Sequence, residues 1–300
     1  MVLVSATAFG TNAIFAKLAY RAGLSTTQTL AFRFVLAALG MWGLALVLGQ
    51  NPLRFPRRSL LALLGLGAIV YTAQSLSYFL ALRTLPASLV VLIVYIYPSL
   101  VVAAGWLFMR RPVSLWHIVG LASSFIGLVL LVGGAKVQLS AGLVFAIAAP
   151  VFYTGYILLS ENVMNHVPAV GASAVIMSGA GAAFCVIGAL QGQLALPASA
   201  AGWAVVAGLA LIPTMIAISL FLAGLPRVGA ARASLLSTWE PVVTVLLAVS
   251  LLGDRFTLPQ ALGGLLVLVA VIVVQGSAAR RTLYGYPADR AAHDPGPHAG

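Results

Sequence analysis

The chain has 300 residues, of which 62% are hydrophobic and only 7% are charged, and its formal net charge is +11 at pH 7. A mean hydropathy of +1.08 excludes a soluble globular domain, in which about a quarter of the residues are charged. The basic residues stand at the ends of apolar runs and form no basic face with interleaved aromatic residues, which excludes nucleic-acid binding. The composition therefore predicts an integral membrane protein surrounded by lipid.

Ten apolar runs follow one another along the chain. A helix needs about 20 apolar residues to cross a bilayer, because each residue adds about 1.5 Å and the hydrocarbon core is about 30 Å thick. The sequence therefore predicts an all-α integral membrane fold with ten transmembrane helices. The predicted spans are 2–20, 27–49, 60–82, 87–109, 115–133, 140–160, 170–190, 200–222, 229–252 and 258–276.

The last segment, residues 277–300, differs in character from the spans. It has no apolar periodicity and contains three prolines, three arginines and two histidines, so we expect a disordered tail. His293 and His298 are too weak a pattern to predict a metal site, and the sequence predicts no metal and no cofactor.

Lys and Arg in the short loops predict the orientation. The loops on the N-terminal side of the spans hold nine of these residues and those on the opposite side hold five. Because basic loops stay on the cytoplasmic side, we expect both termini in the cytoplasm and a multi-pass protein of the plasma (inner) membrane.

The chain contains an internal repeat. A shift of 143 residues superposes the first five runs on the second five without a gap and brings Pro98 onto Pro241 and Gly120 onto Gly263. Five is an odd number, so the second unit must enter the membrane from the other side. We predict two inverted five-helix repeats, residues 1–135 and 139–276, a plan typical of secondary transporters with a substrate site between the halves.

Three segments carry a family resemblance: AFGTNAIFAKLAYRAGLSTTQTLAFRF (8–34), SYFLALRTLPASLVVLIVYIYPSLVVAAGWLF (77–108) and FLAGLPRVGAARASLLSTWEPVVTVLLAVSLLGDRFT (221–257). With them the chain resembles EamA-type transporters of the drug/metabolite transporter superfamily over residues 1–276. The Gly-Glu-Arg that often ends the family's fourth and ninth helices reads Gly253-Asp254-Arg255 in the second copy, and the first copy departs from it. The resemblance implies ten helices and transport of amino acids, other metabolites or drugs.

Glu240 is the sharpest single feature, because it lies about twelve residues into an apolar span of 24 residues. A charge at the bilayer centre costs at least ~2.5–3.5 kcal/mol, which favours the protonated carboxyl and suits a proton-coupling group. Pro241 leaves the carbonyl of Ser237 without its helical partner. Ser237, Glu240 and Thr244 share one polar face of the helix. One interpretation is a proton or cationic-substrate site, and the alternative is a structural ion pair with Arg33 or another buried donor that holds two helices together.

Two basic residues lie inside the first spans. Arg33 is about seven residues into the second span and either snorkels to headgroups, binds a substrate carboxylate or pairs with Glu240. Lys17 lies near the end of the first span and either snorkels or lies at the mouth of a cavity.

Polar and aromatic residues recur at helical spacing and should face the bundle interior. Tyr71, Gln74, Ser75 and Tyr78 form such a stripe, read either as cavity lining or as helix–helix hydrogen bonding. Trp239 either stacks on a ligand or packs. The predicted substrate site comprises Glu240, Trp239, Tyr78, Gln74, Tyr71, Tyr95, Asn12, Tyr156, Ser237 and Arg33, with Glu240 as the proton-coupling group.

These features predict a secondary active transporter, an exporter or a proton-linked carrier, of a small organic metabolite such as an amino acid. Its expected partners are a small-molecule substrate, membrane lipid and, if coupling is by Glu240, protons, in a monomer or a homodimer. A primary pump would need a phosphate-binding loop of the G-x-x-x-x-G-K-[ST] type, which the sequence lacks. The alternatives are an intramembrane enzyme, for which the spans offer one carboxylate, and a non-transporting sensor or lipid-binding protein.

Overall fold

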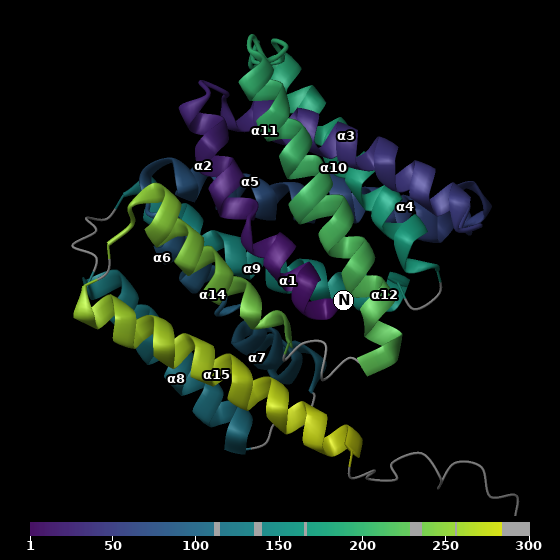
Figure 1. Ribbon diagram of the computed structural model, residues 1–300. Coiled ribbons are helices and arrows are strands. Elements are labelled where there is room, and N and C mark those ends of the chain that lie inside the picture. The colour runs from purple at the N-terminus through teal and green to yellow at the C-terminus, as the bar shows by residue number, and fades with distance from the viewer. Residues whose placement is uncertain (111–114, 135–139, 165–166, 229–235, 256, 284–300) are drawn as a thin grey trace, which may run out of the picture.

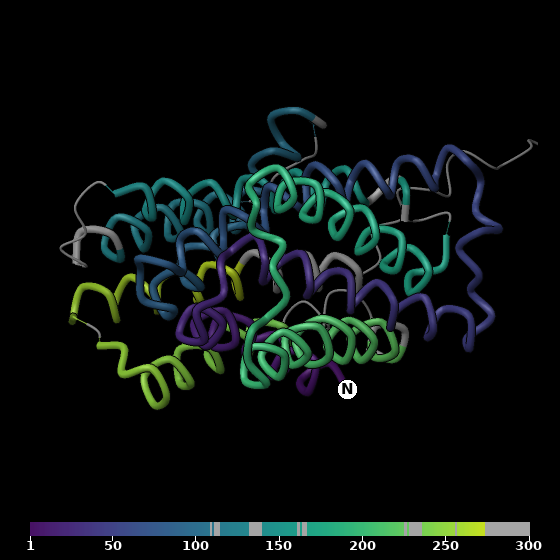
Figure 2. Tube along the Cα trace, turned by 90° about the horizontal axis from the view of Figure 1, so that it is seen from above, coloured from purple at the N-terminus to yellow at the C-terminus, as the bar shows by residue number. Residues whose placement is uncertain are grey.

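The computed structural model describes residues 1–110, 115–134, 140–164, 167–228, 236–255 and 257–283, and every regular element in these segments is a helix. Seven helical stretches are long and apolar enough to cross a membrane, and three shorter apolar helices lie at 115–131, 239–252 and 258–273. Together they coincide with the ten predicted spans, so the predicted all-α membrane fold is confirmed. In Figures 1 and 2 the helices lie side by side with their axes in one general direction.

The first five spans are built from α-helices, two of them interrupted and one containing a π-helical turn. A short 3₁₀ turn joins the second span to the third. In chain order the elements are α1 (Val2–Gly10), α2 (Asn12–Arg21), α3 (Thr26–Val47), η1 (Pro52–Arg54), α4 (Arg57–Gly65), η2 (Leu66–Tyr71), α5 (Thr72–Thr84), α6 (Ala87–Val94), α7 (Tyr97–Met109) and α8 (Leu115–Gly134).

The second five spans are also helical, but the sixth is one continuous helix with Pro150 inside it, and π-helical segments lie in the eighth and ninth. In chain order the elements are α9 (Ala141–Met164), α10 (Ala169–Leu190), α11 (Ala200–Ala210), η3 (Leu211–Ile216), α12 (Ala217–Val228), α14 (Trp239–Leu247), η4 (Ala248–Leu252) and α15 (Leu258–Leu283). Helix α15 covers the first residues of the segment that the sequence assigns to a tail, and 284–300 lie outside the described residues.

Irregular turns fall at corresponding places in the two halves. The fourth span breaks at Tyr95 (ψ 5°), between α6 and α7. In the ninth span α14 begins after Thr238 (ψ −8°), and the 143-residue shift pairs Thr238 with Tyr95. Each break precedes a proline, Pro98 or Pro241, which cannot donate a helical hydrogen bond. The π-helical segments η2 and η3 likewise lie in the third and eighth spans, which the shift also pairs.

The contacts between spans obey the same symmetry. The second span (α3) packs on the seventh (α10), the fifth (α8) on the tenth (α15), and α6 of the fourth on α14 of the ninth. The first span contacts the eighth through α1 and α12, and the third contacts the sixth through α5 and α9. Exchanging the halves converts each of these pairs into itself or into another pair, as two inverted five-helix repeats require.

The distribution of side chains is that of a protein in lipid. Large apolar residues such as Phe108 and Leu190 are 79% and 84% exposed, whereas Arg33 is only 5% exposed. In water the arrangement would be reversed, because charged side chains are almost never fully buried unless they are paired. The polar groups of the spans are therefore gathered inside the bundle.

Candidate functional site: a polar cavity between the two halves

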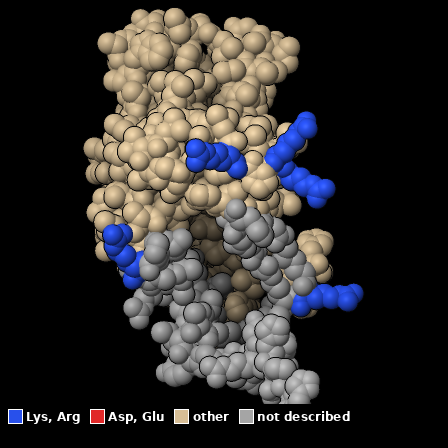
Figure 3. All heavy atoms as spheres, turned by 90° about the vertical axis from the view of Figure 1, so that its right-hand side faces the viewer, with Lys and Arg blue, Asp and Glu red and all other residues tan. Residues whose placement is uncertain are grey.

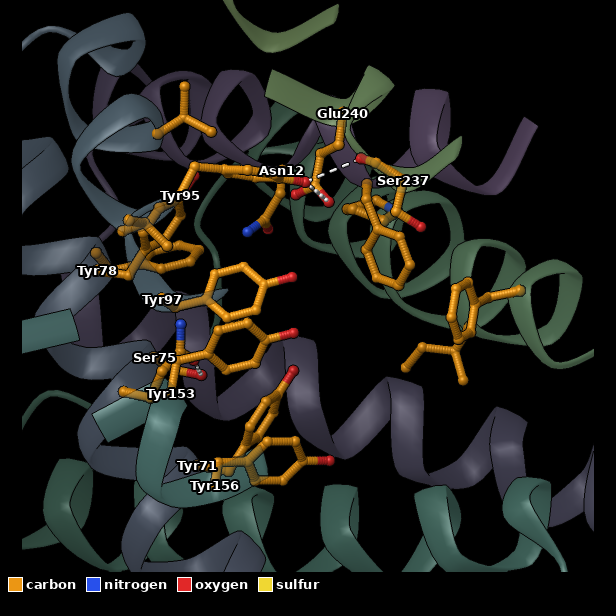
Figure 4. Close-up of a pocket in the computed structure, with 18 of the residues that line it drawn as sticks. Asn12, Tyr71, Ser75, Tyr78, Tyr95, Tyr97, Tyr153, Tyr156, Ser237 and Glu240 are labelled. Carbon is orange, nitrogen blue, oxygen red and sulfur yellow. Dashed lines mark hydrogen bonds between the residues drawn. The ribbon is translucent and has the colours of Figure 1, made fainter. Parts of the chain in front are cut away.

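A cavity of about 350 Å³ lies inside the bundle, with walls from both halves of the chain. Figure 4 shows its polar side chains converging on one space. The predicted site residues that line it are Asn12, Arg33, Tyr71, Gln74, Tyr78, Tyr95, Tyr156, Ser237 and Glu240.

Glu240 reaches the cavity from the first turn of α14. The hydroxyl of Tyr95, at the break between α6 and α7, donates to Glu240 Oε2 at 2.8 Å and lies 3.1 Å from the carbonyl oxygen of Ser237. In a regular helix this carbonyl would accept from the N–H of residue 241, but Pro241 has no N–H. The Tyr95 hydroxyl of the first half therefore replaces a helical donor that the second half lacks. The predicted polar face of the ninth span is thus anchored across the two repeats.

A close approach of α1 and α14 fixes the position of Glu240. Thr244 Oγ1 donates to the carbonyl oxygen of Gly10 at 2.9 Å, so Thr244 packs the two helices together while Ser237 and Glu240 line the cavity. A Cβ on Gly10 would lie 2.9 Å from Val243 Cβ and 3.0 Å from the carbonyl oxygen of Glu240. Only glycine lets the two backbones come this close.

Arg33 lines the same cavity but does not pair with Glu240. Its Nε donates to Thr214 Oγ1 at 3.2 Å, and its guanidinium carbon lies 5.0 Å from the ring centroid of Phe34 and 5.6 Å from that of Phe79. Among the described residues no carboxylate comes within the 4.0 Å of an ion pair with Arg33. The structural ion pair considered from the sequence is therefore not formed.

A row of tyrosines connects the two charged residues. Consecutive ring centroids lie 5.8, 4.6, 6.0 and 5.1 Å apart along Tyr95, Tyr97, Tyr153, Tyr156 and Tyr71. The row continues from Tyr71 to Phe34, at 5.6 Å, next to Arg33. In Figure 4 the hydroxyls of Tyr71, Tyr97, Tyr153 and Tyr156 point toward the same space.

The predicted site lacks two of these tyrosines. Tyr153 stands three residues before Tyr156, and this helical spacing is a signal that places both on one face. Tyr97 carries no such signal, because two residues apart on a continuous helix point in widely different directions. The break after Val94 turns Tyr97 toward the cavity, and the sequence alone does not predict that break.

Trp239 does not line the cavity. Its indole Nε1 donates to Thr7 Oγ1 at 3.2 Å, and the side chain is 43% exposed. Because Trp239 and Glu240 are consecutive on a helix, they point about 100° apart. The expected stacking of Trp239 on a ligand in this cavity is not supported, whereas the packing alternative agrees with its position.

Hydrogen bonds join several segments at one end of the bundle, where α2 ends and α6 begins, and we call this the distal end. Lys17 Nζ donates to the carbonyl oxygen of Leu85 at 2.6 Å, and Asp254 Oδ2 accepts from the backbone N–H and the hydroxyl of Ser88 at 3.0 and 2.6 Å. Tyr20 adds a hydrogen bond to the carbonyl oxygen of Phe79 at 2.7 Å. Lys17 therefore binds protein in this structure and does not snorkel to headgroups.

The opposite end, where α1 begins and α12 and α15 end, we call the proximal end. Figure 3 looks onto this face, where Lys and Arg side chains but no Asp or Glu of the described residues are seen. The cavity lining includes Phe221 and Leu222 of α12, which runs toward this proximal end.

The described residues contain no group of three or more His, Cys, Asp or Glu side chains that could hold a metal ion. His293 and His298 lie outside the described residues. Cys185, the single cysteine of the chain, is free.

Comparison with known proteins gives one family for both halves. A model described as the EamA-like transporter family matches residues 1–133 and 140–275. The chain is 25% identical over 273 residues to the uncharacterized transporter YcbK of Bacillus subtilis, covering 87% of each protein. It is 28% identical over 292 residues to the uncharacterized inner membrane transporter YicL of Salmonella typhimurium, covering 93% of this chain and 95% of that protein.

A third relative is an uncharacterized transporter of Archaeoglobus fulgidus, 26% identical over 70% of this chain and 75% of the relative. A protein of known crystal structure superposes with a TM-score of 0.67 at 20% identity, over 95% of this chain and 98% of that one. At this identity the structural likeness supports the fold alone.

Proposed function

Because the chain belongs to the EamA-like transporter family, we propose that it is a secondary active transporter of a small organic metabolite such as an amino acid. It works as an exporter or a proton-linked carrier by alternating access between its two inverted halves. Membership of the family makes the chain a multi-pass membrane transporter. We further propose that it lies in the inner membrane with both termini in the cytoplasm.

The observation that carries the proposal is Glu240, a carboxyl inside a membrane cavity whose walls come from both halves. A carboxylate at the bilayer centre is costly, so such a residue is by default a functional one. Of the described lining residues it is the only acid. It is therefore the group best placed to exchange a proton for substrate.

The hydrogen bonds of Tyr95 suit such a proton carrier. The Tyr95 hydroxyl has one proton and two neighbouring acceptors, Glu240 Oε2 and the Ser237 carbonyl oxygen. With Glu240 ionised, the phenol donates to the carboxylate. With Glu240 protonated, the carboxyl donates to the phenol oxygen and the phenol donates to the Ser237 carbonyl. Both protonation states keep their hydrogen bonds, as a group that gains and loses a proton in each cycle requires.

The contact between the halves at the distal end suits alternating access. At the distal end Asp254 of the second half binds Ser88 of the first. Opening the distal end would break these few bonds and let the halves rock about the central cavity.

Two other functions are less well supported. An intramembrane enzyme needs a nucleophile with a base, a pair of acids or a metal site, and the single acid of the described lining meets none of these needs. A sensor or lipid-binding protein would bind a ligand without moving it. Counterflow separates that alternative from transport.

The test is solute counterflow in proteoliposomes carrying purified protein, run with and without a pH gradient across a panel of amino acids and other metabolites. We expect the wild type to exchange at least one solute and to accumulate it when a pH gradient is imposed. Absence of flux for the whole panel would contradict the transport proposal.

Glu240→Gln tests the coupling role. The substitution keeps size and hydrogen bonding but removes the exchangeable proton, so we expect solute exchange to persist while the pH gradient no longer drives accumulation. Thermal stability in detergent and gel filtration serve as controls for folding. Normal accumulation with unchanged pH dependence would exclude Glu240 as the coupling group.

A further inference from the structure

Arg33 is a buried cation for which the described residues provide no anion. Its side chain is 5% exposed, and no described carboxylate forms an ion pair with it. Arginine does not lose its proton inside proteins, so the charge persists in the membrane interior. An unpaired buried charge is strongly destabilising, which indicates that a negative group arrives from outside the chain.

The guanidinium group is held in one place. Its Nε donates to Thr214 Oγ1, whose own proton is used at the carbonyl oxygen of Leu209 at 2.8 Å. That carbonyl lies four residues before Pro213 and has therefore lost its helical donor. The rings of Phe34 and Phe79 lie against the cation. The chain thus fixes one edge of the guanidinium and covers it with apolar rings.

The described residues leave the remaining donors of Arg33 unused. Neither Nη group makes a hydrogen bond to any part of the chain that the structure describes. Among the described side chains, Asn12 Oδ1 is the one polar atom that is fully buried without a hydrogen-bond partner. The two Nη atoms of Arg33 also lack a partner among the described residues, so they cannot be fully buried and must retain accessible surface. Because Arg33 lines the cavity, that surface lies where a bound solute would be.

A free guanidinium edge with parallel N–H donors matches the two oxygens of a carboxylate. We therefore propose that Arg33 binds the carboxylate of the transported solute, so that the substrate is an organic acid or a zwitterion, not a simple organic cation. This inference rests on the proposed function and sharpens its substrate class. Glu240, which does not pair with Arg33, is left free to carry the proton.

The test uses a ligand pair of equal shape and different charge, sodium benzoate and benzamide, at constant ionic strength. Binding is measured as the shift in thermal unfolding of the purified protein and by titration calorimetry. We expect benzoate to stabilise the wild type and benzamide to bind much more weakly. Equal binding of the two compounds, or no binding of benzoate, would overturn the proposal.

Arg33→Gln removes the charge, and we expect it to weaken benzoate binding roughly 10- to 100-fold while leaving weak benzamide binding unchanged. Arg33→Lys keeps the charge without the paired donors and should lose less, and it remains informative if the Gln variant does not fold. The matched control is Arg83→Gln, at an exposed arginine in the last turn of α5, which should bind like the wild type. Unchanged benzoate binding by both Arg33 variants would exclude the site.

This outcome is separable from that of the proposed function. Counterflow without any effect of Arg33 on benzoate would refute the carboxylate site and leave transport intact. Arg33-dependent benzoate binding without flux would do the reverse.

Discussion

The phenolic proton of Tyr95 lies at the junction of the two halves. It sits within hydrogen-bond distance of a carboxylate and of a carbonyl that a proline leaves without its helical donor. Glu240 and Arg33 lie in the same cavity without pairing, so each of them remains available to a solute or a proton. At the residue scale, the proposed proton and carboxylate sites depend on the hydrogen bonds of these three side chains.

Tyr95→Phe removes this hydroxyl without changing the size of the ring. We expect proton-driven accumulation to fall roughly 3- to 10-fold, the value of one hydrogen bond of about 1 kcal/mol, while exchange persists. Uptake in proteoliposomes measures the effect.

Tyr97→Phe is the matched control, because it removes a cavity hydroxyl that has no bond to Glu240. If the two variants lose the same activity, the specific role of the Tyr95 proton is wrong.

At the scale of elements, breaks in the helices place side chains where straight helices would not. The break at Tyr95 turns Tyr97 into the cavity, and the break between α1 and α2 lies beside α14, where Gly10 permits contact. At the distal end Asp254 accepts from the N–H of Ser88 in the first turn of α6. It therefore acts as a helix N-cap supplied by the other half.

Asp254→Ala removes that cap, and we expect it to lower the free energy of unfolding by about 1–2 kcal/mol. Asp254→Asn keeps an oxygen acceptor for Ser88 and should lose less than half of that. Unfolding in mixed detergent–SDS micelles provides the measurement. Equal stability of Asp254→Ala and the wild type would show that the contact contributes nothing to stability at the distal end.

At the scale of the whole molecule, the bundle has a distal and a proximal end. At the distal end Asp254 of the second half binds Ser88 of the first half. Helix α12, whose Phe221 and Leu222 line the cavity, runs toward the proximal end. The proposed location of both termini in the cytoplasm would place the proximal end on the cytoplasmic side, where the cavity would receive solute from inside the cell.

This orientation predicts the sidedness of cysteine labelling. In a Cys185→Ser background, Leu222→Cys in the cavity wall should react with a membrane-impermeant maleimide faster in inside-out vesicles than in right-side-out vesicles. Arg255→Cys, at the exposed distal end, should show the opposite preference. Reaction of both cysteines from the same side would contradict the predicted topology.

The sequence by itself determined the ten spans, because the length and apolarity needed to cross lipid are local properties of each run. It also indicated the inverted plan, since the paired prolines Pro98 and Pro241 recur 143 residues apart. Helical spacing and the cost of polar groups in lipid pointed to most of the cavity lining, including Asn12, Gln74 and Glu240, although their roles remain predictions, as do the repeat boundaries at 135 and 139.

Only the tertiary structure decided which polar groups meet. Whether Arg33 pairs with Glu240, whether Lys17 snorkels, and where Trp239 and Tyr97 point all depend on contacts between segments far apart in the chain. A helical pattern gives the face on which a residue lies, but not the neighbour that this face meets or the angle introduced by a break. Those choices arise from packing between the two halves, and the proposed proton and carboxylate sites follow from them.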